Sequence, residues 1–590
     1  MISSRLSAQP SSGAGLSASE VSLKASSLYL ASAFGGANSI GNEVARLVGS
    51  GPAAWRMRTS FTALESVNQP GGRAVECRLA IGWVLAFAGA KLLLHFLTIA
   101  FTPYEIHRDE FLYLAMGEHL KVWGMDFPPA IAFMARAARF VFGDTLFAVR
   151  FFPALAGTGI VLLGGLLARE LGGGRVAQII AMTALFSSPL FIRPAALFQP
   201  VVWDQLWWTL GFFATIKILK HGGLRWWVVL GVAGGFGLLT KFSILFFAFG
   251  IFVGVLFSDH RRLLKSPAAW IAVAIALVIG SPTVVGQISL HFPVVTHMTD
   301  LRNEQLKRVT AGDFLFGQVW MLGPALILAL TGLVFLLRAQ AFRAIGTACI
   351  SAFLVLLILQ GKAYYLGPVY PVLFAAGGVA IDRWQRPARV SVAVLTVVVL
   401  ILGGGLSLPL GLPLLPPEAM ARFCARVASK SAVTTNRGHT LALPQDYADM
   451  LGWQDQVRAV AGVFASLPAD ERAGAGLMAR NYGEAGALEF YGRRFGLPSR
   501  LMLPKNDLLW PSDNSCRVVV SIGIPPADLR RFFGQVDVAA HFDHPWMVEE
   551  ERDRVICISR NPIRDLREAW KRHSAAAEGR SEDRSNPGER

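Results

Sequence analysis

The sequence predicts a mainly α-helical, polytopic membrane protein that ends in a small α/β domain. Apolar residues make up 53% of the 590-residue chain, and the mean hydropathy is +0.45, which is high for a soluble enzyme of this size. Long apolar runs recur between residues 79 and 410, and they stop after residue 416. These observations place a transmembrane domain at 79–416 and a second domain at 417–562.

The apolar runs are long enough to cross the ~30 Å hydrocarbon core of a bilayer as helices. We expect about eleven such helices, because each run approaches the roughly 20 residues that a span requires. The expected ranges are 79–100, 150–170, 176–194, 197–217, 225–240, 242–257, 268–289, 314–337, 342–360, 366–382 and 388–410.

Basic residues predict the orientation of these helices. Clusters such as Arg261, Arg262 and Lys265 occupy alternate loops, which the positive-inside rule places in the cytoplasm. With the N-terminus inside, an odd number of spans leaves residues 417–562 on the outer side of the membrane.

The C-terminal segment alternates helical stretches with short strand-like ones, which is typical of a small α/β domain. The expected helices are Glu418–Ser429, Trp453–Leu467, Ala485–Phe495 and Ala527–Phe533, and the expected strands are Gly476–Ala479, Val518–Ile522 and Val555–Ser559. Residues 1–78 and 563–590 are predicted to be disordered, because polar and small residues dominate there. The N-terminal segment has no signal-peptide pattern, and Met57 is an alternative start.

Composition argues against several classes of function. The net charge of +16 could suggest nucleic acid, but its basic clusters lie between apolar runs, where topology signals occur. The five cysteines have no spacing typical of a zinc or redox site. We expect two of Cys424, Cys516 and Cys557 to form a disulfide, because all three would occupy an oxidising compartment.

Three acidic residues are candidates for chemistry. Asp109 and Glu110 follow the first apolar run, where an acidic pair can act as a general base, hold a divalent cation, or only cap the next helix. Asp204 lies inside an apolar run, roughly 10 Å deep at the rise of a helix. An ionisable group at that depth indicates function, and a structural hydrogen bond to a neighbouring helix is the alternative.

Isolated basic residues lie in the loops assigned to the outer side. Lys241 and Lys362 can each neutralise a phosphate, or extend to the lipid headgroups without a further role. His291 and Arg302 lie in another outer loop, where a structural role is the simpler interpretation. Carboxylates beside cations at one membrane surface are suited to a phosphate-linked lipid substrate.

Several segments together resemble the bacterial members of the protein mannosyltransferase family, which is glycosyltransferase family 39 of the GT-C superfamily and includes the aminoarabinose transferase of lipid A. The resemblance covers about residues 79–410. It is carried by the Asp109–Glu110 pair, Pro128-Pro129, Leu146–Gly157, Leu167–Gly173, Lys241-Phe242-Ser243 and Gly361–Pro371. One departure is Phe127, which stands where the lipid A transferases have a lysine.

The resemblance implies an inverting transfer of a sugar from a polyprenyl-phosphate donor to a periplasmic acceptor, which could be lipid A, a glycan or a protein. It implies a bacterial inner-membrane protein whose active site and C-terminal domain face the periplasm. Asp109 then becomes the catalytic candidate, Glu110 its partner and Asp204 the second acid. The candidates for binding the donor phosphate, which rest more on physical grounds, are Lys241, Lys362, Tyr365, His291 and Arg302.

Two cofactor questions follow. A divalent cation (Mg²⁺, Mn²⁺ or Zn²⁺) could bind at Asp109 and Asp204, whereas no nucleotide cofactor is expected. Gly483 and Gly486 do not complete a dinucleotide fingerprint. Their turn, Asn481–Ala487, could bind an anion at a helix N-terminus, but glycines there more often let elements pack closely.

Two other functions remain as alternatives. Transfer of another lipid-linked group is disfavoured, because the outer segment has no His/Asp cluster for metals and no GxSxG turn. A membrane transporter or lipid-binding scaffold is disfavoured, because the sequence shows no internal repeat.

Overall fold

The computed structural model describes residues 77–384, 388–427, 430–499, 501–502 and 516–563. The described residues belong to one compact unit, residues 63–590. The N-terminal segment up to residue 76, which includes Met57, and the tail from residue 564 lie outside the described residues. The predicted disorder of both segments therefore stays a prediction.

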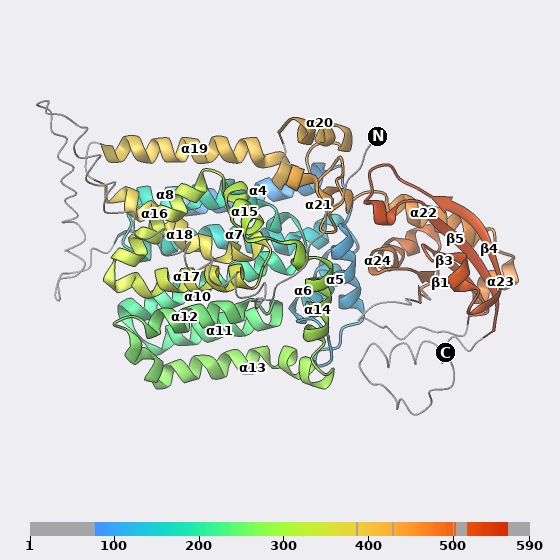
Figure 1. Cartoon of the computed structure of the whole chain (residues 1–590), viewed down its shortest axis with the longest axis horizontal. Helices are drawn as coiled ribbons and strands as arrows, with labels where there is room; N and C mark the ends of the chain where they lie inside the picture. The colour runs from blue at the N-terminus through green and yellow to red at the C-terminus, as the bar shows by residue number, and fades with distance from the viewer. Residues whose placement is uncertain (1–76, 385–387, 428–429, 500, 503–515, 564–590) are drawn as a thin grey trace, which may run out of the picture. The chain divides into compact units, whose positions relative to one another are not determined.

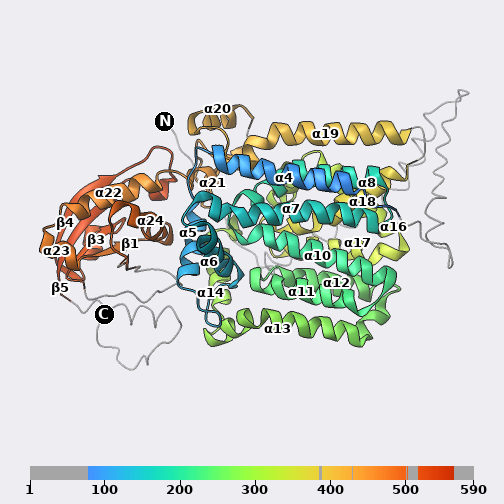
Figure 2. The same cartoon turned by 180° about the vertical axis from the view of Figure 1, so that it is seen from behind.

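Helices coincide with every predicted apolar run, which confirms the helical membrane class (Figure 1). Most of them run side by side in both views of the chain (Figures 1 and 2). These helices are α4 (Ile81–Phe101), α7 (Leu146–Glu170), α8 (Arg175–Ser187), α10 (Pro200–His221), α11 (Leu224–Thr240), α12 (Ile244–Leu256), α13 (Pro267–Ser289), α15 (Ala311–Leu322), α16 (Ala325–Arg338), α17 (Arg343–Ile358), α18 (Tyr370–Asp382) and α19 (Ala388–Gly411).

Length and composition qualify six of the described helices to cross a membrane, or up to eight spans if two bent pairs are included. The predicted run 314–337 is one such pair, because α15 and α16 meet at 106°. The run 176–194 is the other, since α8 and α9 (Pro189–Ile192) belong to a pair bent by 75°. Proline at each break cannot donate the helical hydrogen bond, so neither run forms one straight helix.

The outer faces of the bundle carry the apolar side chains that lipid would cover. Only 17% of the apolar window of α13 and of α19 is buried within the protein. These two helices lie at opposite edges of the bundle (Figures 1 and 2). The chain is a multi-pass membrane protein.

Shorter helices lie at the end of the bundle that is nearest the C-terminal domain (Figures 1 and 2). The loop 101–149 forms α5 (Arg108–Glu118) and α6 (Ala130–Phe142), and a later loop forms α14 (Pro293–Glu304). After the bundle come α20 (Pro417–Val427) and α21 (Gln445–Ala448).

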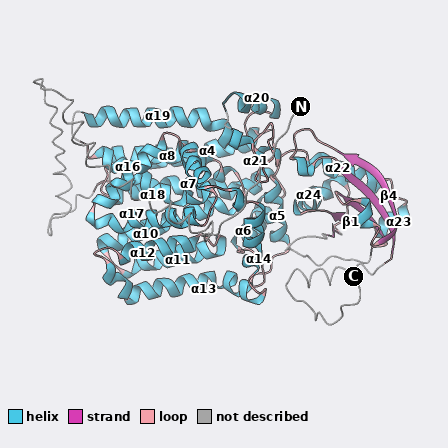
Figure 3. Cartoon of the chain, in the orientation of Figure 1, coloured by secondary structure: helices cyan, strands magenta, loops and turns pink. Residues whose placement is uncertain are grey.

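The C-terminal domain is the predicted α/β fold, with helices against a five-stranded sheet (Figure 3). The strand order is β2-β1-β3-β5-β4; β1 runs parallel to β2 and β3, whereas β5 is antiparallel to β3 and β4. The strands are β1 (Gly476–Ala479), β2 (Leu501–Met502), β3 (Val518–Ile522), β4 (Phe533–Phe542) and β5 (Arg554–Pro562), and the helices are α22 (Trp453–Ala465), α23 (Ala469–Gly474), α24 (Tyr482–Tyr491) and α25 (Pro526–Leu529).

Two strands were not predicted, β2 (Leu501–Met502) and β4 (Phe533–Phe542). The helix expected at Ala527–Phe533 ends at Leu529, and Phe533 begins β4. β4 is an edge strand that pairs only with β5 in the sheet, and most of its side chains are not buried. Polar and apolar residues alternate only over Gln535–Val538, a short stretch, so the sequence signal for a half-buried strand is weak.

The predicted disulfide is wrong. Cys424 and Cys557 have free thiols, so no two of the three candidate cysteines are joined. The two residues also lie in separate apolar clusters, Cys424 beside Tyr447 and Cys557 beside Val519 in the sheet domain.

Candidate active site

The Asp109–Glu110 pair begins α5. His107 precedes the helix in an extended conformation; its Nδ1 accepts a hydrogen bond from the Asp109 N–H (3.0 Å), and its own N–H donates to Glu110 Oε2 (2.7 Å). These bonds satisfy amides that a helix leaves unpaired at its start, where the helix dipole also favours acidic side chains. Local capping therefore fixes the position of both acids.

Glu110 is fully buried and accepts four hydrogen bonds, the first from the His107 N–H. Arg150 on α7 donates from Nη2 to Oε2 (3.1 Å) and from Nε to Oε1 (3.3 Å), and the Phe198 N–H donates to Oε1 (2.7 Å). Burial raises the pKa of Glu110, but the Arg150 guanidinium and these hydrogen bonds lower it below its ordinary value. These contacts favour a structural role for Glu110; its predicted catalytic role stays a prediction.

Asp109 lies half-buried where the membrane helices meet the C-terminal domain. Its Oδ1 accepts a hydrogen bond from the Tyr482 hydroxyl (2.8 Å), and its Oδ2 accepts one from Gln199 Nε2 (3.3 Å). Gln199 precedes α10, whose first residue is proline, and Tyr482 is the first residue of α24. Burial and the Asp109 charge raise the pKa of Tyr482 well above its ordinary value, so the phenol stays protonated as a donor.

Asp204 forms a second group with Lys241 and Tyr365. Its side chain is buried within α10, where Ser243 Oγ donates to Oδ1 (2.6 Å) and Lys241 Nζ lies 3.8 Å from Oδ2. The Lys241 ammonium also lies 4.7 Å from the centre of the Tyr365 ring, within the range of a cation–π contact. The structure brings these three predicted residues together.

Lys362, the residue before the short helix Ala363–Val369, is held by two amide side chains. Its Nζ donates to Gln305 Oε1 (2.6 Å) and to Asn436 Oδ1 (3.1 Å), which are both neutral amides. Burial lowers the pKa of Lys362, the carboxylate of Asp109 opposes this shift, and the Lys241 charge adds to it.

The predicted role of His291 and Arg302 in binding the donor phosphate stays a prediction. Both side chains are exposed, His291 just before α14 and Arg302 in its last turn. Among the described residues, no hydrogen bond or ion pair links either side chain to Asp109 or Asp204.

Ion pairs attach the C-terminal domain to α5 and were not predicted. Arg108 Nε lies 3.4 Å from Asp449 Oδ1, and its Nη1 lies 3.4 Å from Glu550 Oε2. Arg193, at the end of α9, pairs with Asp446 (3.1 Å). Burial raises the pKa of Asp449 to about 6, although Arg108 opposes the shift. No local pattern could reveal these partners, because they lie hundreds of residues apart in the chain.

The Asn481–Ala487 turn allows close packing, as predicted, but against α5 rather than against a strand. Asn481 caps α24 and forms a capping box with Glu484. A Cβ on Gly486 would lie 2.5 Å from Phe111 Cβ, so a larger residue would force the two helices apart. Glycine thus lets α24 approach α5 and brings Tyr482 to Asp109.

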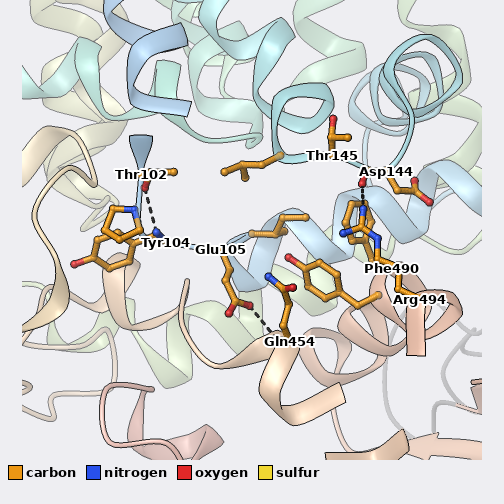
Figure 4. A pocket seen from close by; sticks show the side chains of 12 residues that line it. Thr102, Tyr104, Glu105, Asp144, Thr145, Gln454, Phe490 and Arg494 are labelled. Carbon is orange, nitrogen blue, oxygen red and sulfur yellow. Dashed lines mark hydrogen bonds between the residues drawn. The ribbon is translucent and has the colours of Figure 1, made fainter. Parts of the chain in front are cut away.

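A pocket of about 380 Å³ lies beside the site, where the connection between α4 and α5 faces the C-terminal domain (Figure 4). Glu105 Oε2 accepts a hydrogen bond from the Gln454 N–H (3.0 Å) at its wall, and Arg494 donates to the Asp144 carbonyl. Asp109 is not among the lining residues, so the pocket is adjacent to the acid and does not contain it.

The donors present do not fit a metal site built by the protein. In the part of the chain that the structure describes, no three His, Cys, Asp or Glu side chains form a group that could hold a metal ion. Asp109 and Asp204, the predicted ligands, engage separate partners. The predicted divalent cation stays a prediction, and no step below depends on one.

Comparison with known families matches residues 126–285, from the loop before α6 to α13, to the family described as dolichyl-phosphate-mannose-protein mannosyltransferase. The whole fold is similar to ArnT from Cupriavidus metallidurans bound to undecaprenyl phosphate, with a TM-score of 0.56 and 16% identity over 81% of this chain and 98% of that one. Residues 126–285 of this chain are thus similar to the protein mannosyltransferase family, and the chain has an ArnT-like fold. ArnT in the apo state gives a TM-score of 0.54 and 15% identity over 82% of this chain and 98% of that one. Comparison with curated sequences finds no significant match.

The protein mannosyltransferase-like segment contains part of the site. Asp204 and Lys241 lie within residues 126–285, whereas Asp109, Lys362 and Tyr482 lie outside them. The similarity to ArnT confirms the predicted GT-C type of fold, and the roles of these five residues rest on the geometry described above.

Proposed function

We propose that the protein transfers a sugar from a polyprenyl-phosphate donor to an acceptor in the periplasm, with inversion at the anomeric carbon. The observation that carries this proposal is the arrangement at Asp109. A half-buried carboxylate lies at the boundary of the membrane domain, and its charge acts on Lys362, a partly buried cation without a carboxylate among its hydrogen-bond partners.

The names of the similar proteins support this donor class. The matching family is described by a dolichyl-phosphate sugar, and the ArnT structure holds undecaprenyl phosphate. Both lipids are polyprenyl phosphates. The site residues of this chain offer the chemistry that such a donor needs, namely cations for the phosphate and a carboxylate for the acceptor.

In this proposal Lys362 binds the donor phosphate, with Lys241 next to it. Lys362 now donates to two neutral amides, so a phosphate oxygen could replace either and form a charge-assisted hydrogen bond. Lys241 already faces Asp204, so that acid would hold the ammonium in place while the phosphate binds. Tyr365, under the Lys241 ammonium, would limit its movement.

Asp109 would serve as the general base. An acceptor hydroxyl attacks the anomeric carbon, the bond from that carbon to the phosphate oxygen breaks, and polyprenyl phosphate leaves with the electron pair. Asp109 takes the acceptor's proton as the new bond forms, and the lysines stabilise the charge on the leaving phosphate. Attack opposite to the leaving group gives inversion.

The periplasmic side of a bacterial inner membrane is part of the proposal. The basic loops that the sequence assigns to the cytoplasm lie at one end of the helices, and α5, α14 and the C-terminal domain lie at the other (Figures 1 and 2). A donor flipped to the outer leaflet would then reach Asp109 from the bilayer.

Replacing Lys362 by alanine is expected to raise the apparent KM for the donor roughly ten- to a hundredfold, which corresponds to the ~1.5–3 kcal/mol of a charged hydrogen bond. The kcat should change little, because the lysine holds the phosphate in both ground and transition states. Initial rates of sugar transfer at increasing donor concentration measure both constants.

Lys121→Ala is the matched control, because Lys121 is exposed just after α5. It should leave the donor KM unchanged. An unchanged KM for Lys362→Ala would show that this lysine does not bind the phosphate.

A further inference from the structure

The Tyr482 hydroxyl is hydrogen-bonded to Asp109, the carboxylate that takes the acceptor's proton in the proposed reaction. A general base must lie about 2.6–3.2 Å from the oxygen whose proton it takes. The Tyr482 hydroxyl oxygen lies 2.8 Å from Asp109 Oδ1, and Gln199 binds the other oxygen at 3.3 Å. A hydroxyl of the protein therefore already stands where an acceptor hydroxyl would.

Tyr482 is held there by a close helix contact. Gly486 packs α24 against Phe111 of α5, and Arg108 joins the same helix α5 to Asp449 and Glu550. The Arg108 guanidinium also lies 6.0 Å from the centre of the Tyr482 ring. The tyrosine side chain is only partly buried.

We propose that Tyr482 is a place-holder for the acceptor, whose hydroxyl covers Asp109 in the resting enzyme, excludes water from it and is displaced by the acceptor hydroxyl. This inference rests on the proposed function. Water at that position would attack the anomeric carbon, release polyprenyl phosphate and pass its proton to Asp109. The activated sugar would then be lost as free sugar.

Replacing Tyr482 by phenylalanine is expected to raise the ratio of free sugar released to sugar transferred about tenfold, since a hydrogen bond to a charged group is lost. The missing hydroxyl leaves space for a water molecule beside Asp109. Both products are measured in one reaction, with a radiolabelled polyprenyl-phosphate sugar added to membranes that contain the natural acceptors.

Three comparisons make the test decisive. Tyr491→Phe, the same change in the same helix, should keep the wild-type ratio. Tyr482→Leu, which also lacks the hydroxyl, should raise the ratio as Tyr482→Phe does. It provides the same test if Tyr482→Phe folds poorly. Adding Asp109→Asn to Tyr482→Phe should abolish the extra hydrolysis.

A purely orienting role for Tyr482 predicts something different. Both hydrolysis and transfer would then fall together, and an unchanged ratio in Tyr482→Phe and Tyr482→Leu would overturn the place-holder. Absence of both products with the wild-type protein would instead contradict the proposed function itself.

Discussion

Replacing Asp109 by asparagine is expected to reduce sugar transfer at least about a hundredfold, the lower range for loss of a general base. Asparagine has nearly the same size and can still accept from Tyr482, while Gln199 can turn its amide to face the new NH₂ group. Stability should change by only about 1 kcal/mol, as for most substitutions outside the core. Initial transfer rates and thermal unfolding of the purified variant measure the two effects.

Asp300→Asn is the matched control for this variant, because Asp300 is exposed on α14. It should transfer sugar at the normal rate. Normal transfer by well-folded Asp109→Asn would refute a general base at this position, whereas loss of both transfer and folding would make Asp109 a structural residue.

Replacing Glu110, the next residue, should mainly reduce the stability of the protein. Glu110→Ala is expected to lower the free energy of unfolding by about 3–5 kcal/mol, because it leaves the buried Arg150 guanidinium without its counter-charge. That is a large share of the ~5–15 kcal/mol that stabilises a typical domain. The yield of monodisperse protein and its thermal midpoint should both fall.

A double variant separates charge from hydrogen bonding. Glu110→Gln with Arg150→Met keeps an acceptor for the Phe198 amide and removes both buried charges, so it should recover most of the lost stability. An unchanged thermal midpoint for Glu110→Ala would show that the ion pair does not hold α5 in place.

Much of the fold could be predicted from the sequence, because membrane helices are recognised by the length and composition of apolar runs. The bends at Ser188-Pro189 and Gly323-Pro324 were not predicted, since average hydropathy across a run does not register the local loss of a hydrogen bond. The exposed edge strand β4 was not predicted because its alternation of polar and apolar residues is confined to Gln535–Val538.

The site could be predicted only in part. Asp204 and Lys241 were each singled out by their polarity within apolar surroundings, and the structure places them 3.8 Å apart. Asp109 and Glu110 were predicted as one pair, but successive residues of a helix project about 100° apart. Asp109 consequently faces Tyr482, whereas Glu110 faces the buried Arg150.

Tyr482 itself could not be predicted, because it meets Asp109 across 373 residues of chain. The glycines mark this turn in the sequence, but the element that they pack against is set by the packing of α24 on α5. Long-range contacts of this kind leave no periodic signal in one sequence.

The most direct test of the account is transfer from a defined donor. Purified wild-type protein, reconstituted into vesicles with a radiolabelled polyprenyl-phosphate sugar and an envelope extract from the source cells, should move label from the lipid to an acceptor and leave polyprenyl phosphate behind. A panel of pentose and hexose donors covers the unknown sugar, and Asp109→Asn provides the background. We expect label on an acceptor with at least one donor, about a hundredfold above that background. Equal labelling by the wild type and Asp109→Asn with every donor would contradict the account.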